Sequence, residues 1–151
     1  MKDLLLITPP FTQLNTPYPA TAYLKGFLNT KNISSYQIDL GIEVILEIFS
    51  KKGVTEIFNV KPENLSENAQ RIFALKEEYI KTIDEVIAFL QNKKPTLARQ
   101  ICSMNFLPEA SRFNQLDDME YAFGNMGLQD KAKHLATLYL EDLSDYIIEN
   151  I

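Results

Sequence analysis

The hydrophobic positions near the N-terminus switch from a continuous run to a helical period within the first thirty or so residues. Leu4 to Ile7 is an uninterrupted apolar run, typical of a strand buried on both faces of a sheet. A helix is predicted from about Ala20 to Lys31. Its expected sheet-packing face consists of Ala20, Tyr23, Leu24, Phe27 and Leu28. Tyr36 to Leu40 is predicted to be a second strand, so the order strand, helix, strand predicts a right-handed βαβ unit with parallel strands.

After Gly41 the pattern becomes helical. Ile42 to Ser50 is expected to form a helix with Gly53 as its stop. Val54 to Val60 is interpreted as helix or turn, although its β-branched residues also permit a strand. A long helix is predicted from Asn64 to about Asn92, where Ser66 and Glu67 resemble a helix start.

Prolines divide the remaining sequence. Pro95 and Pro108 precede two shorter predicted helical segments, at 96–104 and at about 109–123. A final amphipathic helix is expected from Gln129 to about Glu149. The predicted organisation is therefore a βαβ region at 1–60, followed by a helical extension or insertion at 61–151 that packs on it.

The predicted fold class is an α/β start, of the flavodoxin-like or Rossmann-like kind, followed by a predominantly α-helical region. It has two or three parallel strands, whereas an open parallel sheet usually has four or more. A strand as apolar as Leu4 to Ile7 needs neighbours on both sides. We therefore expect an incomplete sheet, either because the chain is a fragment of a longer protein or because a second copy completes the sheet.

Composition narrows the classes of function. The 151 residues are 46% hydrophobic and 23% charged, which is typical of a folded globular protein. The net charge of −5 and the scattered basic residues argue against nucleic-acid binding. The first apolar run is too short for a signal peptide, and no stretch is long enough to span a bilayer, so a cytoplasmic protein without membrane contact is expected.

Few residues carry reactive side chains in a recognisable pattern. Cys102 is the single cysteine, which excludes an internal disulfide and a cysteine-based metal or cluster site. It is interpreted as a small core residue. His134 is the single histidine, and it is interpreted as a surface or boundary residue because no partner pattern surrounds it. We predict no catalytic residues and no metal ligands.

The proline-rich connection after the first strand is the candidate site. It follows the carboxyl end of a predicted strand, the edge at which open α/β sheets bind ligands. The candidate cofactor-binding residues, which would line a cleft at this edge, are Thr8, Pro9, Pro10, Phe11, Thr12 and Asp39. The alternative is a stiff connection, with Asp39 as a cap for the next helix. A phosphate cradle is disfavoured because the glycine motif is absent and proline lacks the amide N–H.

The same stretch carries a family resemblance. Pro9-Pro10, Pro17 and Pro19, Tyr23-Leu24 and Asp39-Leu40 occur in the order seen at the start of radical SAM proteins with a cobalamin-binding domain. Residues 3 to 60 resemble that region. Ala20-Thr21 stands where family members usually have Gly-Leu, and both the cobalt-ligating Asp-x-His-x-x-Gly motif and the cluster-binding Cys-x-x-x-Cys-x-x-Cys motif are absent.

The resemblance implies the N-terminal cobalamin-binding-like or substrate-binding portion of a larger radical SAM enzyme, not catalytic by itself. Cobalamin is the cofactor it implies for this region, whereas a [4Fe–4S] cluster and SAM would belong to a C-terminal part absent from this sequence. The partner would then be the remainder of the same polypeptide. The alternative is a non-enzymatic helical interaction module whose sheet is completed in a homodimer. An independent hydrolase or transferase is a weaker option, because no Ser-His-Asp or metal constellation is present.

Overall fold

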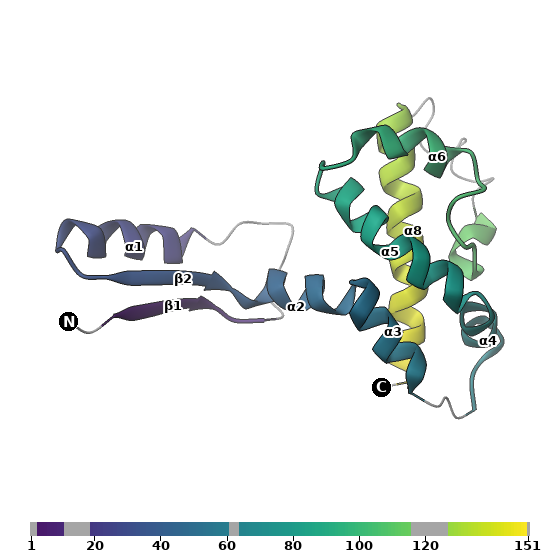
Figure 1. Cartoon of the computed structure of the whole chain (residues 1–151), viewed down its shortest axis with the longest axis horizontal. Coiled ribbons are helices and arrows are strands. Elements are labelled where there is room, and N and C mark those ends of the chain that lie inside the picture. The colour runs from purple at the N-terminus through teal and green to yellow at the C-terminus, as the bar shows by residue number, and fades with distance from the viewer. Residues whose placement is uncertain (1–2, 11–18, 61–63, 116–126, 151) are drawn as a thin grey trace. The chain divides into compact units, whose positions relative to one another are not determined.

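The computed structural model describes residues 3–10, 19–60, 64–115 and 127–150. They divide into two compact units, an α/β unit at 1–48 and a helical unit at 49–151. Figure 1 shows the elements of each unit. Each unit is described separately below.

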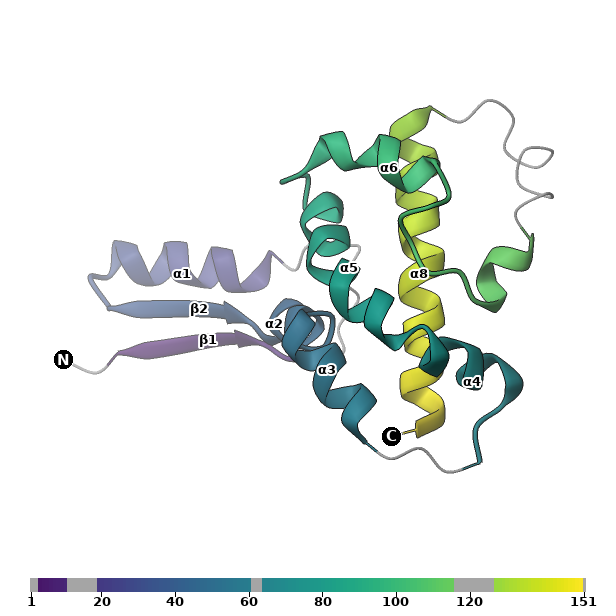
Figure 2. The ribbon, with the colours of Figure 1, turned by 45° about the vertical axis from the view of Figure 1, so that its right-hand side comes forward.

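The α/β unit contains two parallel strands joined through a helix. Strand β1 (Leu4–Thr8) pairs with strand β2 (Ser35–Asp39), and helix α1 (Ala20–Thr30) lies between them in sequence. In both ribbon views α1 runs along β2, with β1 on the far side of β2 from the helix (Figures 1 and 2). Helix α2 (Leu40–Ile48) starts where β2 ends and lies beyond the carboxyl ends of the strands. The predicted strand, helix, strand order with a parallel sheet is thus confirmed at this coarse level.

The burial expected for the first strand and helix is wrong in the described residues. Leu4, Leu5 and Ile7 of β1 are exposed. The stripe of α1 expected to pack on the sheet is exposed as well, except for half-buried Leu28. The reason is the small size of the sheet. With two strands and two helices, the described α/β unit has too few elements to cover a doubly apolar strand.

The helical unit is built around its last helix, α8 (Leu128–Asn150), as predicted for Gln129 to Glu149. The shorter elements of this unit are α3 (Lys51–Asn59), α4 (Glu67–Ala74), α5 (Lys76–Leu90), η1 (Pro95–Leu97), α6 (Ala98–Cys102) and η2 (Ser111–Gln115). Elements α4, α5, α6 and η2 all contact α8. Figure 2 shows α4 towards one end of α8 and α6 towards the other.

Two predicted helix boundaries are wrong. Gly53 does not stop a helix. It is buried inside α3, and the chain turns earlier, where the Ser50 hydroxyl accepts a hydrogen bond from the Gly53 amide and caps α3. The long helix expected from Asn64 is two helices, because the chain tightens at Leu75. The Leu75 amide is within hydrogen-bond distance of the carbonyl oxygens of both Arg71 and Ile72, as in a 3₁₀ turn.

The core of the helical unit is rich in aromatic residues. The Phe58 ring lies 4.9 Å from that of Tyr146, and the Tyr79 ring lies 4.9 Å from that of Tyr139, centroid to centroid. The Tyr139 hydroxyl donates to the Tyr79 carbonyl oxygen at 3.1 Å and lies 3.0 Å from the Thr82 hydroxyl. The Tyr146 hydroxyl, in contrast, is buried with no hydrogen-bond partner in the part of the chain that is described.

Candidate functional site

The carboxyl edge of the two-stranded sheet brings together two of the predicted site residues. Thr8 and Asp39 are direct partners in the strand register, so their backbones are adjacent at the ends of β1 and β2. Pro9 follows as an exposed residue and Pro10 as a half-buried one. Phe11 and Thr12 lie outside the described residues.

Asp39 serves the fold locally. One of its carboxylate oxygens accepts a hydrogen bond from the backbone amide of Ile42 at 3.2 Å. Ile42 is the third residue of α2, so this bond caps the start of that helix. The side chain of Thr8 is buried. A cofactor site is a concave surface on which several polar groups converge. Among the described residues of this edge, the Thr8 side chain is buried and the Asp39 carboxylate is already engaged by the Ile42 amide.

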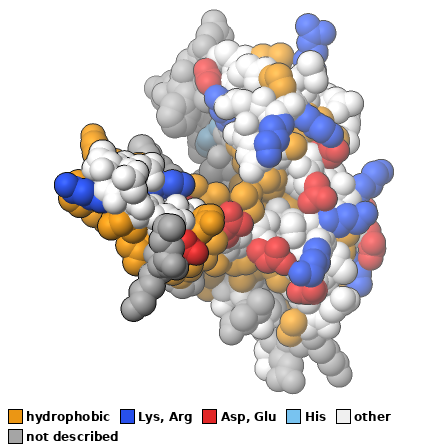
Figure 3. Space-filling model, turned by 60° about the vertical axis from the view of Figure 1, so that its left-hand side comes forward, with side chains coloured by type: hydrophobic (Ala, Val, Ile, Leu, Met, Phe, Trp, Pro, Cys, Tyr) orange, Lys and Arg blue, Asp and Glu red, His pale blue; other side chains and the backbone are white. Residues whose placement is uncertain are grey.

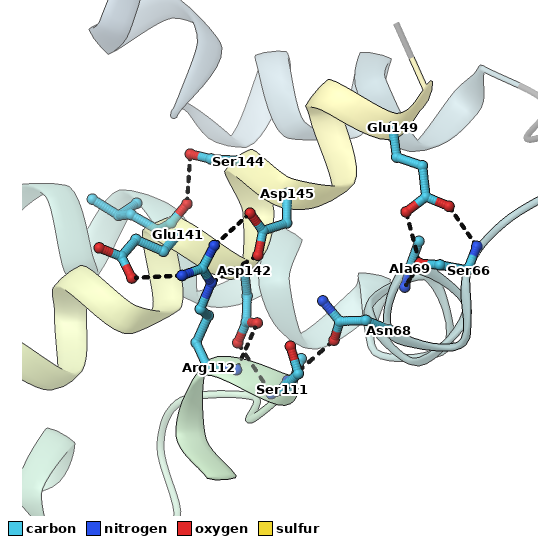
Figure 4. A network of polar contacts seen from close by, with 12 residues as sticks. Ser66, Asn68, Ala69, Ser111, Arg112, Glu141, Asp142, Ser144, Asp145 and Glu149 are labelled. Atoms are coloured by element: carbon cyan, nitrogen blue, oxygen red, sulfur yellow. Dashed lines mark hydrogen bonds and ion pairs between the residues drawn. The ribbon is translucent and has the colours of Figure 1, made fainter. Parts of the chain in front are cut away.

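A second cluster of polar residues joins η2 to α8 in the helical unit (Figure 4). At its centre is Asp142, which is fully buried in α8. Its two carboxylate oxygens accept hydrogen bonds from the amides of Ala110 and Arg112, each at 3.2 Å. Burial raises the pKa of this carboxyl above its ordinary value, and the two backbone hydrogen bonds partly oppose that rise.

The rim of this cluster is a bidentate ion pair. The Arg112 guanidinium donates to both oxygens of Asp145, at 2.8 Å each, and lies 3.7 Å from a carboxylate oxygen of Glu141. The hydrogen bonds to Asp145 raise the pKa of the guanidinium. Contacts to Asp142, Asp145 and Glu141 fasten the 110–112 segment to α8, and the Ser111 amide also donates to the Asn68 side-chain oxygen of α4 at 3.1 Å. Asp142 thus holds the backbone of the 110–112 segment through two hydrogen bonds.

This cluster was not predicted from the sequence, although the sequence contains one signal of it. Asp142 falls three residues after Tyr139 and four before Tyr146, on the apolar stripe of α8. An acid at such a position must find buried donors or be neutral. Its donors come from backbone amides about thirty residues away, which no spacing rule reveals.

The helical unit carries an open hollow near the start of α3. It is lined by Ser50, Lys51, Lys52, Thr55, Glu56 and Asp84. The start of α3 lies beside this hollow, but the backbone amides of Lys51 and Gly53 there already have hydrogen-bond partners. The Ser50 hydroxyl accepts from Gly53, and an Asp84 oxygen accepts from the Lys51 amide at 2.8 Å. The Lys51 and Gly53 amides are therefore not available to bind an anion.

The two lone reactive side chains also lack a catalytic setting. The Cys102 thiol is half-buried and donates to the Leu128 carbonyl oxygen at 3.6 Å. Burial raises the pKa of this thiol, which disfavours the nucleophilic thiolate. His134 is half-buried on α8, in agreement with the boundary position expected for it. Within the described ranges, no three His, Cys, Asp or Glu side chains are grouped so that they could hold a metal ion.

What remains is an apolar surface on the α/β unit. The strand register places Leu5, Ile7 and Tyr36 on one side of the sheet, here called the sheet face. Tyr23, Leu24 and Phe27 form a second group, the α1 stripe. These six side chains expose between 48% and 79% of their surface. In Figure 3 hydrophobic side chains gather along the lower side of this unit, which makes it the candidate functional surface.

No helix in the described residues combines the length and the apolar character needed to cross a lipid bilayer. Comparisons of the chain with protein-family models, with curated proteins and with solved structures find no match.

Proposed function

We propose that this chain is a non-enzymatic protein-interaction module whose α/β unit completes its sheet by dimerisation. The observation that carries this proposal is the exposure of the sheet face and the α1 stripe, in a unit whose strands pair only with each other in the described residues. Its β1 strand consists of Leu4-Leu5-Leu6-Ile7-Thr8, a composition that favours burial rather than solvent.

The size of this apolar surface supports an interface. A large hydrophobic side chain presents about 200 Å² when free. At the exposures found, the six side chains together leave roughly 700 Å² on each protomer. Divided between the sheet face and the α1 stripe, this is roughly 350 Å² for each group, which lies in the ~300–600 Å² range of the largest and often functional patch on a typical monomer.

Light scattering during size-exclusion chromatography of the full chain tests the proposal. The mass is expected to rise from the 17.3 kDa of a monomer towards twice that value as the concentration increases over the micromolar range. Leu5→Lys and Ile7→Lys place a charge on the β1 part of the sheet face and are expected to shift the chain towards monomer. Ile148→Lys is the matched control, because Ile148 is 81% exposed but belongs to the helical unit.

Two results would contradict the proposal. One is a monomeric mass throughout the concentration range. The other is an equal loss of association in Ile148→Lys and Leu5→Lys, since a general gain of charge would then explain both.

A second candidate is the N-terminal portion of a larger radical SAM enzyme, in which the remaining strands come from the same polypeptide. It is supported by the parallel β1–α1–β2 arrangement with Thr8 and Asp39 adjacent at the strand ends, which is the order that the family resemblance implies. In that role this chain is a scaffold, and a cluster and SAM would be bound elsewhere. Cobalamin titration, followed by the corrin absorption spectrum, is expected to give weak or no binding. Tight stoichiometric binding would contradict a scaffold role.

A further inference from the structure

The outer edge of β1 carries an unpaired set of backbone groups. The Leu4 amide donates to the Ser34 carbonyl oxygen at 3.0 Å, so Leu4 turns its backbone groups towards β2. Along a strand this direction alternates, and Leu6 and Thr8 therefore also face β2. The N–H and C=O groups of Leu5 and Ile7 point to the opposite edge, where no described strand pairs with them.

We infer that two copies of the chain pair through this edge, with the β1 strands antiparallel and the twofold axis at Leu6. This inference rests on the dimer proposed above and specifies its contact. Leu5 and Ile7 alone present outward groups within β1, and a twofold axis at Leu6 is the one that pairs both of them, Leu5 of one copy with Ile7 of the other. The two such pairs form four hydrogen bonds, and Leu6 faces its own counterpart between them.

The chemistry of β1 fits self-pairing. Exposed edge strands are normally protected by lysine, proline or a bulge. Leu4–Thr8 contains no charged residue and no proline, so the antiparallel pair sets no like charges opposite each other. Each Leu5 side chain lies beside an Ile7 side chain of the partner on one face, and the two Leu6 side chains meet on the other.

The edge of β2 is a poorer choice. By the same alternation its outward backbone groups belong to Ser35, Gln37 and Asp39, and the Asp39 carboxylate already caps α2. Helix α1 also runs along β2 rather than along β1 (Figure 2). The more apolar edge is therefore that of β1, whose Leu4–Thr8 segment contains no charged residue.

Cysteine cross-linking tests the register. In a Cys102→Ser background, Leu6→Cys places two thiols in a narrow antiparallel pair. Their Cα atoms would be about 4.5 Å apart, within the roughly 4.4–6.8 Å that a disulfide requires. Mild oxidation of the full chain is expected to convert most of Leu6→Cys to a covalent dimer on a non-reducing gel. Leu5→Cys and Gln37→Cys are the matched controls. The two copies of residue 5 would lie diagonally across the strand pair, about 7–8 Å apart, and residue 37 lies on the opposite, β2 edge of the sheet. Neither variant is therefore expected to cross-link.

A proline variant tests the same contact without oxidation and without loss of the half-buried Leu6 side chain. Leu5→Pro removes from each copy one backbone N–H that points to the outer edge. It leaves the hydrogen bonds between β1 and β2 intact, and proline is tolerated on edge strands. It is expected to raise the dimer Kd about 30-fold, or ~2 kcal/mol, with an unchanged far-ultraviolet spectrum.

The outcomes separate the two proposals. A dimer that cross-links through Gln37→Cys, or that is unaffected by Leu5→Pro, would overturn the β1 register and leave the dimer standing. A chain that stays monomeric would overturn both.

Discussion

Removal of the buried carboxylate of Asp142 provides the sharpest test of how the helical unit is held together. Asp142→Ala leaves the amides of Ala110 and Arg112 without their acceptor, and both bonds are 3.2 Å long in the native fold. An unsatisfied buried donor costs about 1–3 kcal/mol, so the free energy of unfolding is expected to fall by roughly 3 kcal/mol. Asp142→Asn keeps one acceptor oxygen and is expected to cost about half as much.

Urea unfolding of the full chain, followed by circular dichroism at 222 nm, measures this loss. Asp145→Asn is the matched control. It removes a carboxylate of the same cluster that pairs with Arg112 at the surface, and exposed ion pairs contribute ~0–1 kcal/mol. If Asp142→Ala were no more destabilising than Asp145→Asn, the assignment of Asp142 as the buried anchor would be refuted.

The pH dependence gives an independent check with a defined sign. Because the folded-state pKa of Asp142 lies above the ordinary 3.8, the folded protein binds more protons than the unfolded chain just above pH 4. The contribution of Asp142 to stability therefore decreases as pH rises through that window. The stability advantage of the native protein over Asp142→Asn is expected to shrink between pH 4 and the raised pKa, and an advantage that grows there would contradict the shift.

Two further predictions concern single hydroxyl groups in the helical unit. Ser66→Ala removes the cap of α4, which accepts from the Ala69 amide at 3.2 Å and donates to Glu149 at 2.7 Å, and is expected to cost about 1 kcal/mol in urea unfolding. Equal stability of Ser66→Ala and the native chain would contradict that role. Tyr139→Phe is expected to cost about 1–2 kcal/mol because it removes two buried hydrogen bonds, whereas Tyr146→Phe is expected to be neutral or stabilising. Equal losses in these two variants would show that the hydroxyl contacts are irrelevant.

The sequence predicts the elements of this chain better than their surroundings. Local patterns predict β1, α1, β2 and α8 because periodicity and proline act within a few residues. No glycine or proline marks the break between α4 and α5 at Leu75 in the sequence. It arises where the stripe of α4 and that of α5 each pack on α8, which is a tertiary effect.

The candidate site illustrates the same limit. The sequence correctly placed Thr8 and Asp39 at one sheet edge, since parallel strands end together. It left open whether Asp39 would line a cleft or cap a helix, and the hydrogen bond to Ile42 shows the cap. The exposure of Leu5 and Tyr36 could not be predicted. Apolar residues on a strand predict that the strand is buried, but they do not identify the segment or chain that buries it.

The central position of α8 also determines when the helical unit can acquire a core during synthesis. Strand β1 meets β2 by residue 39, whereas α4, α5, α6 and η2 wait for a helix that ends at Asn150. At ~5–20 residues per second, a ribosome needs on the order of ten seconds to add the intervening residues. Until α8 is made, the rings of Phe58 and Tyr79 lack their contacts with Tyr146 and Tyr139. The helical unit therefore cannot bury these rings while the intervening residues are being added, because α8 follows them in the chain.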